Sequence, residues 1–229
     1  MMMEDKIRQI DHIYRNLKLE TPNESHLPTH ASVLLLLTCF AKENFKIFEL
    51  GSGIGHVSLV LGKIYPKSQI IGIEIQKKLY ECSLKNKNAN QSTNVEFYNL
   101  SVKNIKEQFN TEVADYLIFN PPHYFDGIKN KLEDRRTARS SENLEILDNF
   151  LYASKYLLKN KSLGSLVIHP YILSDTVVLL EKNHLKAQHI YVAYGDKKND
   201  AQLVSIVFRK NGGRNLIIHS PIFFRIGKN

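Results

Sequence analysis

The 229-residue sequence predicts one α/β domain built on a mostly parallel sheet with helices on both faces. From residue 46 onward, short apolar runs alternate with helix-length segments, and the runs are apolar throughout, as in strands covered on both sides. The last two runs are joined by a loop too short for a crossover helix, which favours an antiparallel pair. A content of 43% hydrophobic residues, with only 11 glycines and 7 prolines, excludes collagen, coiled coil and wholesale disorder.

Two helices are expected before the sheet begins. Apolar residues recur in steps of three and four over the first 18 residues, which predicts an amphipathic helix. Pro22 and Pro28 interrupt this pattern, and Thr29 or Ser32 can then cap a second helix that runs to Phe40. We therefore expect an N-terminal helical segment over residues 1–40 and a domain over residues 41–229, forming a single domain overall.

Seven strands are expected after residue 45. The parallel strands are predicted at residues 47–50, 70–75, 95–98, 116–119 and 166–169. The helices between them are predicted at residues 57–64, 76–90 and 143–158. Residues 189–194 and 203–208 form the expected antiparallel C-terminal hairpin, and residues 216–224 add a short strand or tail.

Several classes of protein are disfavoured by what the sequence lacks. Its longest apolar run, over residues 33–41, is far shorter than the roughly 20 residues of a membrane-spanning helix, and its polar start is unlike a signal peptide. Two cysteines 43 positions apart support neither a disulfide scaffold nor a zinc site, and the nine histidines form no metal-binding pair on a helix. We expect a cytoplasmic protein with no metal and no membrane contact; the oligomeric state is left open.

A glycine-rich turn follows the first predicted strand. Gly51, Gly53 and Gly55 alternate with Ser52 and Ile54, directly before a predicted helix. Glycines at alternate positions allow a tight turn and a close approach to a ligand, while the helix N-terminus offers unpaired N–H groups. The spacing GxGxG differs from the GxGxxG of dinucleotide sites, and such a turn can also be purely structural.

An acidic residue ends the second predicted strand. Glu74 lies 23 positions after Gly51, and a carboxylate at this place can accept both hydroxyls of a ribose. A solvated glutamate at a strand end is the alternative. Because the carboxyl ends of neighbouring parallel strands meet at one edge, the glycine-rich turn and Glu74 together predict a nucleotide-type site there.

The fourth predicted strand ends in Asn120-Pro121-Pro122-His123. Two prolines fix an extended chain and remove two N–H donors, which leaves carbonyl groups free to accept hydrogen bonds. Asn120 adds a side-chain acceptor. Two acceptors beside an aromatic surface suit an exocyclic amine held next to an electrophile, although a stiff turn would use the same residues.

These motifs, in this order and at these strand ends, resemble the S-adenosylmethionine-dependent methyltransferases of the Rossmann-like class I fold. The Asn-Pro-Pro segment is similar to the (N/D)PP(Y/F/W) motif of the amino-methylating branch. The helix at 28–37, residues 120–127 and 136–142, and the tail at 209–222 resemble bacterial tRNA (valine) adenine-N6 methyltransferases more closely. The resemblance covers about residues 20 to 225.

The resemblance implies roles for individual residues. The methionine and ribose part of the cofactor would lie on Gly51, Ser52, Gly53 and Gly55, its ribose hydroxyls on Glu74, and its adenine near Leu100 and Ser101. Asn120 would also border the cofactor. Ser101 stands where the family often has an acid, so that contact is weaker.

The same resemblance assigns the acceptor side. Asn120 and the Pro121 carbonyl would accept hydrogen bonds from the target amine, with Pro122 stiffening the turn. His123 stands where the family has an aromatic base-stacking residue, and Tyr124 can take over the stacking. His123 could instead mark altered substrate choice or lost activity.

The net charge of +8 favours a polyanionic partner, although a lysine-rich proteome would also produce it. Residues 197–229 hold seven Lys or Arg against one Asp, and residues 125–140 hold five against three acids. We expect RNA, and tRNA first, to contact Tyr124, Arg135, Arg136, Arg139, Lys210 and Arg214.

The sequence therefore predicts an adenine-N6 methyltransferase acting on structured RNA. A methyltransferase for a protein glutamine or a small molecule is an alternative, because the same motif can hold those acceptors. A non-catalytic RNA-binding module with this fold is a second alternative.

Overall fold

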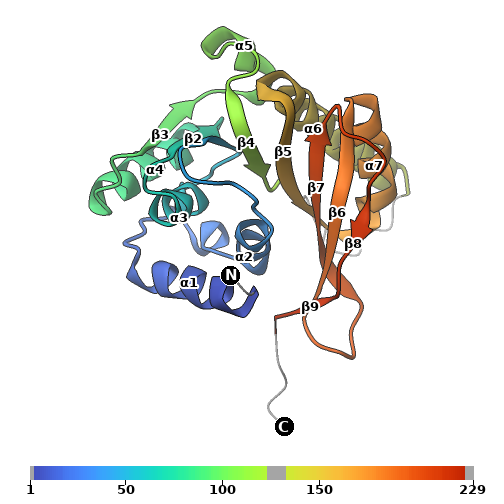
Figure 1. Ribbon diagram of the computed structural model, residues 1–229, viewed down its shortest axis with the longest axis horizontal. Helices are drawn as coiled ribbons and strands as arrows, with labels where there is room; N and C mark the ends of the chain where they lie inside the picture. The colour runs from blue at the N-terminus through green and yellow to red at the C-terminus, as the bar shows by residue number, and fades with distance from the viewer. Residues whose placement is uncertain (1–2, 123–132, 225–229) are drawn as a thin grey trace.

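The computed structural model describes residues 3–122 and 133–224. A sheet of nine described strands, in the order β3-β2-β1-β4-β5-β7-β6-β8 with β9 beside β6, forms the centre (Figure 1). The strands are β1 (Lys46–Leu50), β2 (Gln69–Glu74), β3 (Val95–Asn99), β4 (Ala114–Phe119), β5 (Leu158–Ile168), β6 (Leu185–Tyr194), β7 (Ala201–Lys210), β8 (Ile217–Ile218) and β9 (Ile222–Phe223). The first five are parallel, and β7 is antiparallel to both β5 and β6. The predicted fold class and hairpin are confirmed, with the tail adding two two-residue strands.

Helices cover both faces of the sheet. They are α1 (Met3–Asn16), α2 (His30–Leu37), α3 (His56–Ile64), α4 (Lys77–Ala89), α5 (Ile105–Gln108), α6 (Glu133–Leu157) and α7 (Leu173–Lys182). Short 3-10 turns occupy Glu24–His26, Val102–Asn104 and Pro170–Ile172. None of the helices in the described ranges is both long and apolar enough to cross a lipid bilayer.

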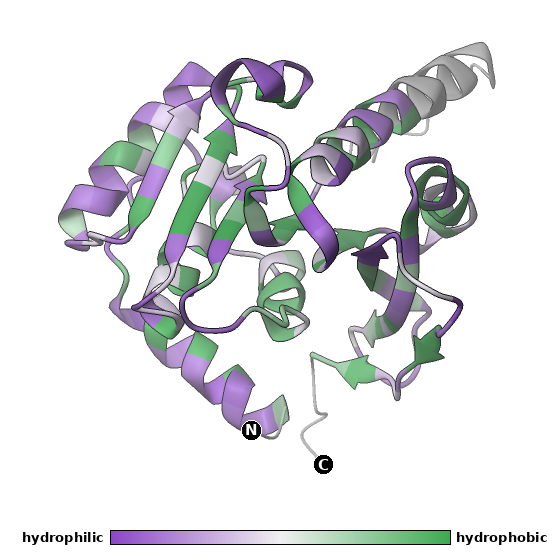
Figure 2. Ribbon diagram, turned by 45° about the horizontal axis from the view of Figure 1, so that its top comes forward, coloured by the Kyte–Doolittle hydropathy of each residue, from purple (hydrophilic) through white to green (hydrophobic). Residues whose placement is uncertain are grey.

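The strands are apolar throughout because helices bury both faces of the sheet. Ile47 and Phe48 of β1 are both fully buried, but they lie in different cores. One core is completed by α5, α6 and α7, and the other by α1, α2 and α3. Figure 2 shows the central strands mostly hydrophobic, whereas α1 is largely hydrophilic with an apolar stripe.

The N-terminal helices belong to the second of these cores. Ile10 of α1 is fully buried there, as are Leu34 and Leu35 of α2. Thr29 is the N-cap residue of α2, and its backbone N–H donates to Ser32 Oγ at 3.3 Å, which is the reciprocal bond of a capping box. The α2 helix ends at Leu37, three residues earlier than expected.

Two helices differ from the sequence-based expectation. The α6 helix begins at Glu133, ten residues before the predicted start. The α7 helix was not predicted; its run Val177-Val178-Leu179-Leu180 has no clear helical period, and Val178 is 67% exposed. The α7 helix packs against β6 and α6 over the first core.

Candidate cofactor and acceptor site

The loop between β1 and α3 has the conformation that its glycines predict. Gly51, Gly53 and Gly55 have φ angles of 71°, 56° and 83°, in the region that favours glycine. The backbone N–H groups of Gly51 and Ser52 donate to the carbonyl of Ile73 at 2.8 and 2.9 Å, which folds the loop onto the end of β2. A Cβ atom at Gly55 would collide with the ring of Phe97. Backbone angle and close packing therefore both require glycine there.

Glu74 holds this loop from the neighbouring strand. The residue is 5% exposed, and its carboxylate accepts the backbone N–H of Gly53 at 2.8 Å and that of Gln76 at 2.7 Å. Asn99 braces the same strand end, because its Nδ2 donates to the carbonyls of Glu74 and Ile75. Each carboxylate oxygen retains a lone pair that can accept a further hydrogen bond, which is what a ribose hydroxyl would need.

The strand ends open into a cavity of about 520 Å³, within the size range of small-molecule sites, roughly 300–1,000 Å³. Its walls are built by residues 51, 53, 73–76, 79, 100–103, 120, 122, 146, 149 and 150, together with His26. Glu74, Leu100, Ser101 and Asn120 are thus brought together as the sequence predicts. Ser101 Oγ accepts the backbone N–H of Lys103 at 3.2 Å, so it also caps a short turn.

A smaller chamber of about 150 Å³ lies on the other side of the glycine-rich loop. It is bordered by residues 27, 29, 32, 35, 49, 52, 54, 56 and 57. Gly51, Gly53, Asn120 and His26 line both spaces, so the two chambers meet at these residues. We call this shared border the junction of the two chambers.

Two buried polar atoms in this region have no hydrogen-bond partner among the described residues. They are Asn120 Oδ1 and Ser52 Oγ. Because buried polar groups are nearly always paired, such atoms beside a cavity indicate that a ligand completes the site. The residues present therefore fit a nucleoside-containing cofactor and an acceptor that donates a hydrogen bond to Asn120.

The smaller chamber contains ionisable groups that the sequence analysis did not assign. Burial raises the pKa of Glu49 to about 8, despite a hydrogen bond from Ser58 Oγ. Burial also lowers the pKa of His56 to about 4, and Tyr14 Oη lies 3.1 Å from its Nδ1. The chamber is therefore mainly neutral at pH 7. Glu49 was visible in the motif, but its burial was not.

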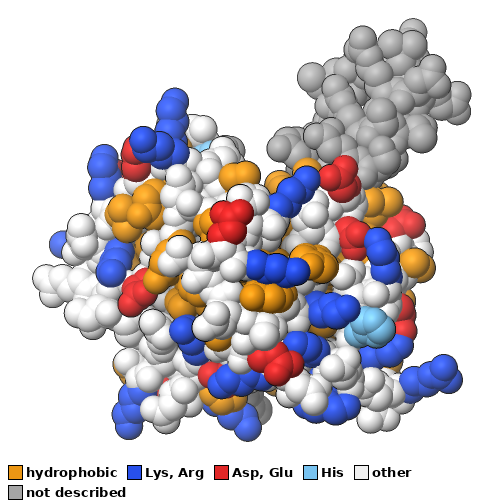
Figure 3. All heavy atoms as spheres, turned by 90° about the horizontal axis from the view of Figure 1, so that it is seen from above, with side chains coloured by type: hydrophobic (Ala, Val, Ile, Leu, Met, Phe, Trp, Pro, Cys, Tyr) orange, Lys and Arg blue, Asp and Glu red, His pale blue; other side chains and the backbone are white. Residues whose placement is uncertain are grey.

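The structure describes only some of the residues predicted for the acceptor side and for RNA contacts. His123 and Tyr124 lie outside the described residues, as do the side chains of Arg135, Arg136 and Arg139 in the first turns of α6. Pro121 is buried and Pro122 lines the larger cavity. Figure 3 shows Lys and Arg interspersed with Asp and Glu over one face, rather than gathered into one patch.

The structure corrects the expectation for Lys210. Its side chain is buried, and Nζ donates to the Leu158 carbonyl at 2.8 Å and to Glu112 Oε1 at 2.9 Å. Lys210 ends β7 beside the start of β5, at the opposite edge of the sheet from Asn120. Arg214 is exposed. It lies near that same edge of the sheet, because the carbonyl of the preceding Gly213 accepts a hydrogen bond from Gln188, near the start of β6. Neither residue flanks the cavity.

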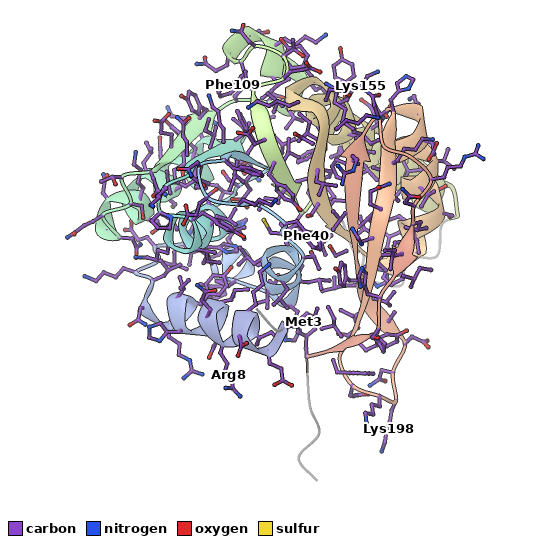
Figure 4. All side chains as sticks on the ribbon, in the orientation of Figure 1. Met3, Arg8, Phe40, Phe109, Lys155 and Lys198 are labelled. Atoms are coloured by element: carbon purple, nitrogen blue, oxygen red, sulfur yellow. The ribbon has the colours of Figure 1, made fainter. Side chains whose placement is uncertain are left out.

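Other basic residues lie at the same edge of the sheet as the cavity. Lys197 and Lys198 occupy the exposed loop between β6 and β7, beyond the carboxyl end of β6. Figure 4 shows Lys198 at the tip of this loop, pointing away from the body. Among the described residues, no three His, Cys, Asp or Glu side chains gather closely enough to hold a metal ion.

A family described as the methyltransferase small domain matches residues 28–166. The chain belongs to this methyltransferase family. As a member, it uses S-adenosylmethionine as the methyl donor. Residues 28–166 include the glycine-rich loop, Glu74 and Asn120, the groups that the two chambers bring together.

Three curated relatives show how far the methyltransferase resembles known proteins. A protein of Methanocaldococcus jannaschii named as a candidate N5-glutamine methyltransferase is 26% identical over 62% of this chain and 71% of its own length. A tRNA1(Val) (adenine(37)-N6)-methyltransferase of Flavobacterium psychrophilum is 26% identical over 72% of this chain and 70% of its own length. The enzyme of that name from Pseudoalteromonas translucida is 26% identical over 61% of this chain and 58% of its own length.

Solved structures support the fold of the methyltransferase. A Pyrococcus horikoshii protein described as a candidate RNA methyltransferase has a TM-score of 0.61 at 17% identity, covering 90% of this chain and 98% of that one. An NSun6 structure from the same organism has a TM-score of 0.66 at 14% identity, over 84% and 57% of the two chains.

Proposed function

We propose that this methyltransferase transfers a methyl group to the N6 amine of an adenine in structured RNA, with tRNA as the first candidate. The observation that carries the proposal is Asn120, whose buried Oδ1 has no partner among the described residues and lies where the two chambers meet. The curated tRNA adenine-N6 methyltransferases among its relatives support the same acceptor.

The chemistry demands positioning more than a strong base. The lone pair of an adenine amine is delocalised into the ring, so the nitrogen must be held in a pyramidal geometry as it attacks. Asn120 Oδ1 and the Pro121 carbonyl can each accept one N–H of the amine. S-adenosylmethionine supplies an electrophilic methyl group when bound. Glu74 and the glycine-rich loop would hold its nucleoside, and the smaller chamber its amino-acid end.

A base within a folded RNA must leave its stack to reach this site. Extrusion costs a few kcal/mol, and stacking on an aromatic side chain offsets part of it. We propose His123 and Tyr124 for this stacking, and Tyr124 with Arg135, Arg136 and Arg139 for contacts to the RNA. Asn120, Pro121, Pro122 and His123 would form the acceptor side of the site.

A glutamine side chain of a protein is the second candidate acceptor. Its carboxamide also presents an N–H₂ group that Asn120 and Pro121 could receive, and a relative named as a glutamine methyltransferase matches this chain with the same 26% identity. An acceptor of this kind would need neither base extrusion nor a basic surface.

Transfer of labelled methyl to unmodified total tRNA, followed by nucleoside analysis, tests the proposal. We expect N6-methyladenosine with the wild type, none with Asn120→Ala and a reduced amount with Asn120→Asp, which keeps an acceptor oxygen. Cofactor binding measured by calorimetry should survive both substitutions. Label found only in protein would establish the second candidate instead. Binding of cofactor and RNA without any transfer would favour a non-catalytic module.

A further inference from the structure

The chain between α1 and α2 lies against α4 on its way to the cavity. We call residues 17–28 the strap. Asn90 Oδ1 accepts the backbone N–H of Lys18 at 3.1 Å, and Asn90 Nδ2 donates to the Lys18 carbonyl at 2.8 Å. Asn86 forms the same pair of bonds with Glu20, at 2.6 and 3.0 Å. One carboxamide from α4 and one from the residue that caps it therefore pair with the strap backbone as a neighbouring strand would.

The spacing of these two pairs explains why they can form together. Asn86 lies in the last turn of α4 and Asn90 caps the end of that helix, four residues further on, a rise of about 6 Å along the helix axis. Lys18 and Glu20 are two residues apart, which in an extended chain is about 6.6 Å. Both carboxamides thus meet the strap in register, and the N-terminal half of the strap is fixed to α4.

Asn86 makes one contact that Asn90 does not. The Nδ2 group of Asn86 also donates to the carbonyl of Ile54 at 3.0 Å, within the glycine-rich loop. The equivalent bond of Asn90 goes to the Asn86 carbonyl, in its own helix. Asn86 is 1% exposed, and its amide hydrogens and oxygen are all used. One buried carboxamide joins the strap, α4 and the glycine-rich loop.

The far half of the strap reaches the site itself. His26 lines both chambers where they meet, and Leu27 lines the smaller one. Ile54 lies between Gly53, which Glu74 holds from β2, and Gly55, the residue that precedes α3. The loop under the junction and the strap that brings His26 to it are therefore bound by the same side chain.

We propose that Asn86 is a positioning residue for the methyl-transfer site, and that it sets the placement of the glycine-rich loop relative to the strap and its His26. His26 then contacts the bound cofactor at the junction of the two chambers. Aspartate cannot replace Asn86, because it lacks both donated hydrogens and would bury a charge. The inference concerns the cofactor, so it holds whether the acceptor is RNA or protein.

Asn90 offers a matched control, since it binds the same strap with the same geometry but does not touch the loop. Calorimetry with S-adenosylmethionine, at a temperature where circular dichroism shows each variant folded, should give at least tenfold weaker binding for Asn86→Ala and Asn86→Asp. Asn90→Ala should change the affinity less than threefold. His26→Ala should weaken binding without lowering the melting temperature. Equal effects at 86 and 90, or unchanged affinity in folded Asn86→Ala, would overturn the proposal.

Hydrogen exchange of the wild-type chain keeps the test decisive if the Asn86 variants fail to fold. Saturating S-adenosylmethionine should slow exchange of the backbone amides in residues 24–27, because the strap contacts the ligand. Exchange in α1, none of whose residues lines either chamber, should change less. Unaltered exchange in the strap on cofactor binding would refute the role given to His26.

Discussion

Glu74 Oε2 accepts the backbone N–H of Gly53 at 2.8 Å, so the acidic residue at the end of β2 holds the glycine-rich loop as well as facing the cavity. The two motifs that the sequence places 23 positions apart are thus one structural unit. A single carboxylate shapes the loop and is available to the ribose that we propose it binds.

Replacing this carboxylate should therefore weaken cofactor binding. In Glu74→Gln, an NH₂ group would face the N–H of Gly53 or Gln76, so one donor would oppose another. A hydrogen bond to a charged group contributes about 1.5–3 kcal/mol, so we expect roughly 10- to 100-fold weaker binding of S-adenosylmethionine by calorimetry. Glu81→Gln, at an exposed position of α4, is the control and should bind normally.

Two glycines of the loop should differ in their tolerance of alanine. At Gly53 a Cβ would meet nothing within 4 Å, so Gly53→Ala should cost only the backbone strain of its positive φ, about 1–2 kcal/mol. At Gly55 the same strain is joined by a collision with Phe97, which adds about 1–3 kcal/mol. Urea unfolding measures both costs, and equal destabilisation would contradict the packing argument.

The raised pKa of Glu49 predicts how the stability of the fold depends on pH. Its pKa in the folded chain is about 8, above the ordinary value of 4.5. Its contribution to the free energy of unfolding is therefore fully present below about pH 4.5 and is lost as pH rises through 8. The lowered pKa of His56 acts in the opposite direction, and only below its ordinary value of 6.5. Between pH 6.5 and 8 we expect the free energy of unfolding to fall by roughly 1–2 kcal/mol.

Thermal melting from pH 6.5 to 8 would show this decline. Glu49→Gln, which resembles the protonated carboxyl and can still accept from Ser58, should flatten the profile and melt higher than wild type at pH 8. Parallel profiles for the two proteins would mean that Glu49 is already ionised in the folded chain.

Lys210 should affect stability and leave RNA binding unchanged. Lys210→Ala leaves the Leu158 carbonyl without this donor and breaks the ion pair with half-exposed Glu112, at a cost of roughly 1–3 kcal/mol. Arg214→Ala, at an exposed position, should leave the melting temperature within about 1 °C of wild type. A lower affinity for tRNA in folded Lys210→Ala, measured by filter binding, would restore the original expectation.

Much of the site could be predicted because its signals are local. Each motif restricts the chain locally. Three glycines in five residues allow positive φ angles, the two prolines after Asn120 fix an extended backbone and remove N–H donors, and an acid ends the next strand. Parallel strands then bring these segments to one edge, so Glu74, Leu100, Ser101 and Asn120 were placed together correctly. The strands were found because their apolar runs are buried on both faces.

Other features depended on contacts between distant segments. Charge counts located basic residues in the tail, but burial of Lys210 depends on Leu158 and Glu112, which lie 52 and 98 positions away. The strap, read as a proline break between helices, is held beside α4 by hydrogen bonds from Asn86 and Asn90 across 66 and 72 positions. Side chains of ordinary composition carry no sequence signal for such pairings.

The sequence by itself determined the α/β class, the methyltransferase family and several residues that line the larger cavity, since periodicity and backbone chemistry act over a few residues. The tertiary structure alone decided that Glu49 is buried, that Lys210 is structural, and that His26 stands at the junction of the two chambers. Exposure, ionisation and pairing arise only when packed elements exclude water and bring remote groups within hydrogen-bonding distance.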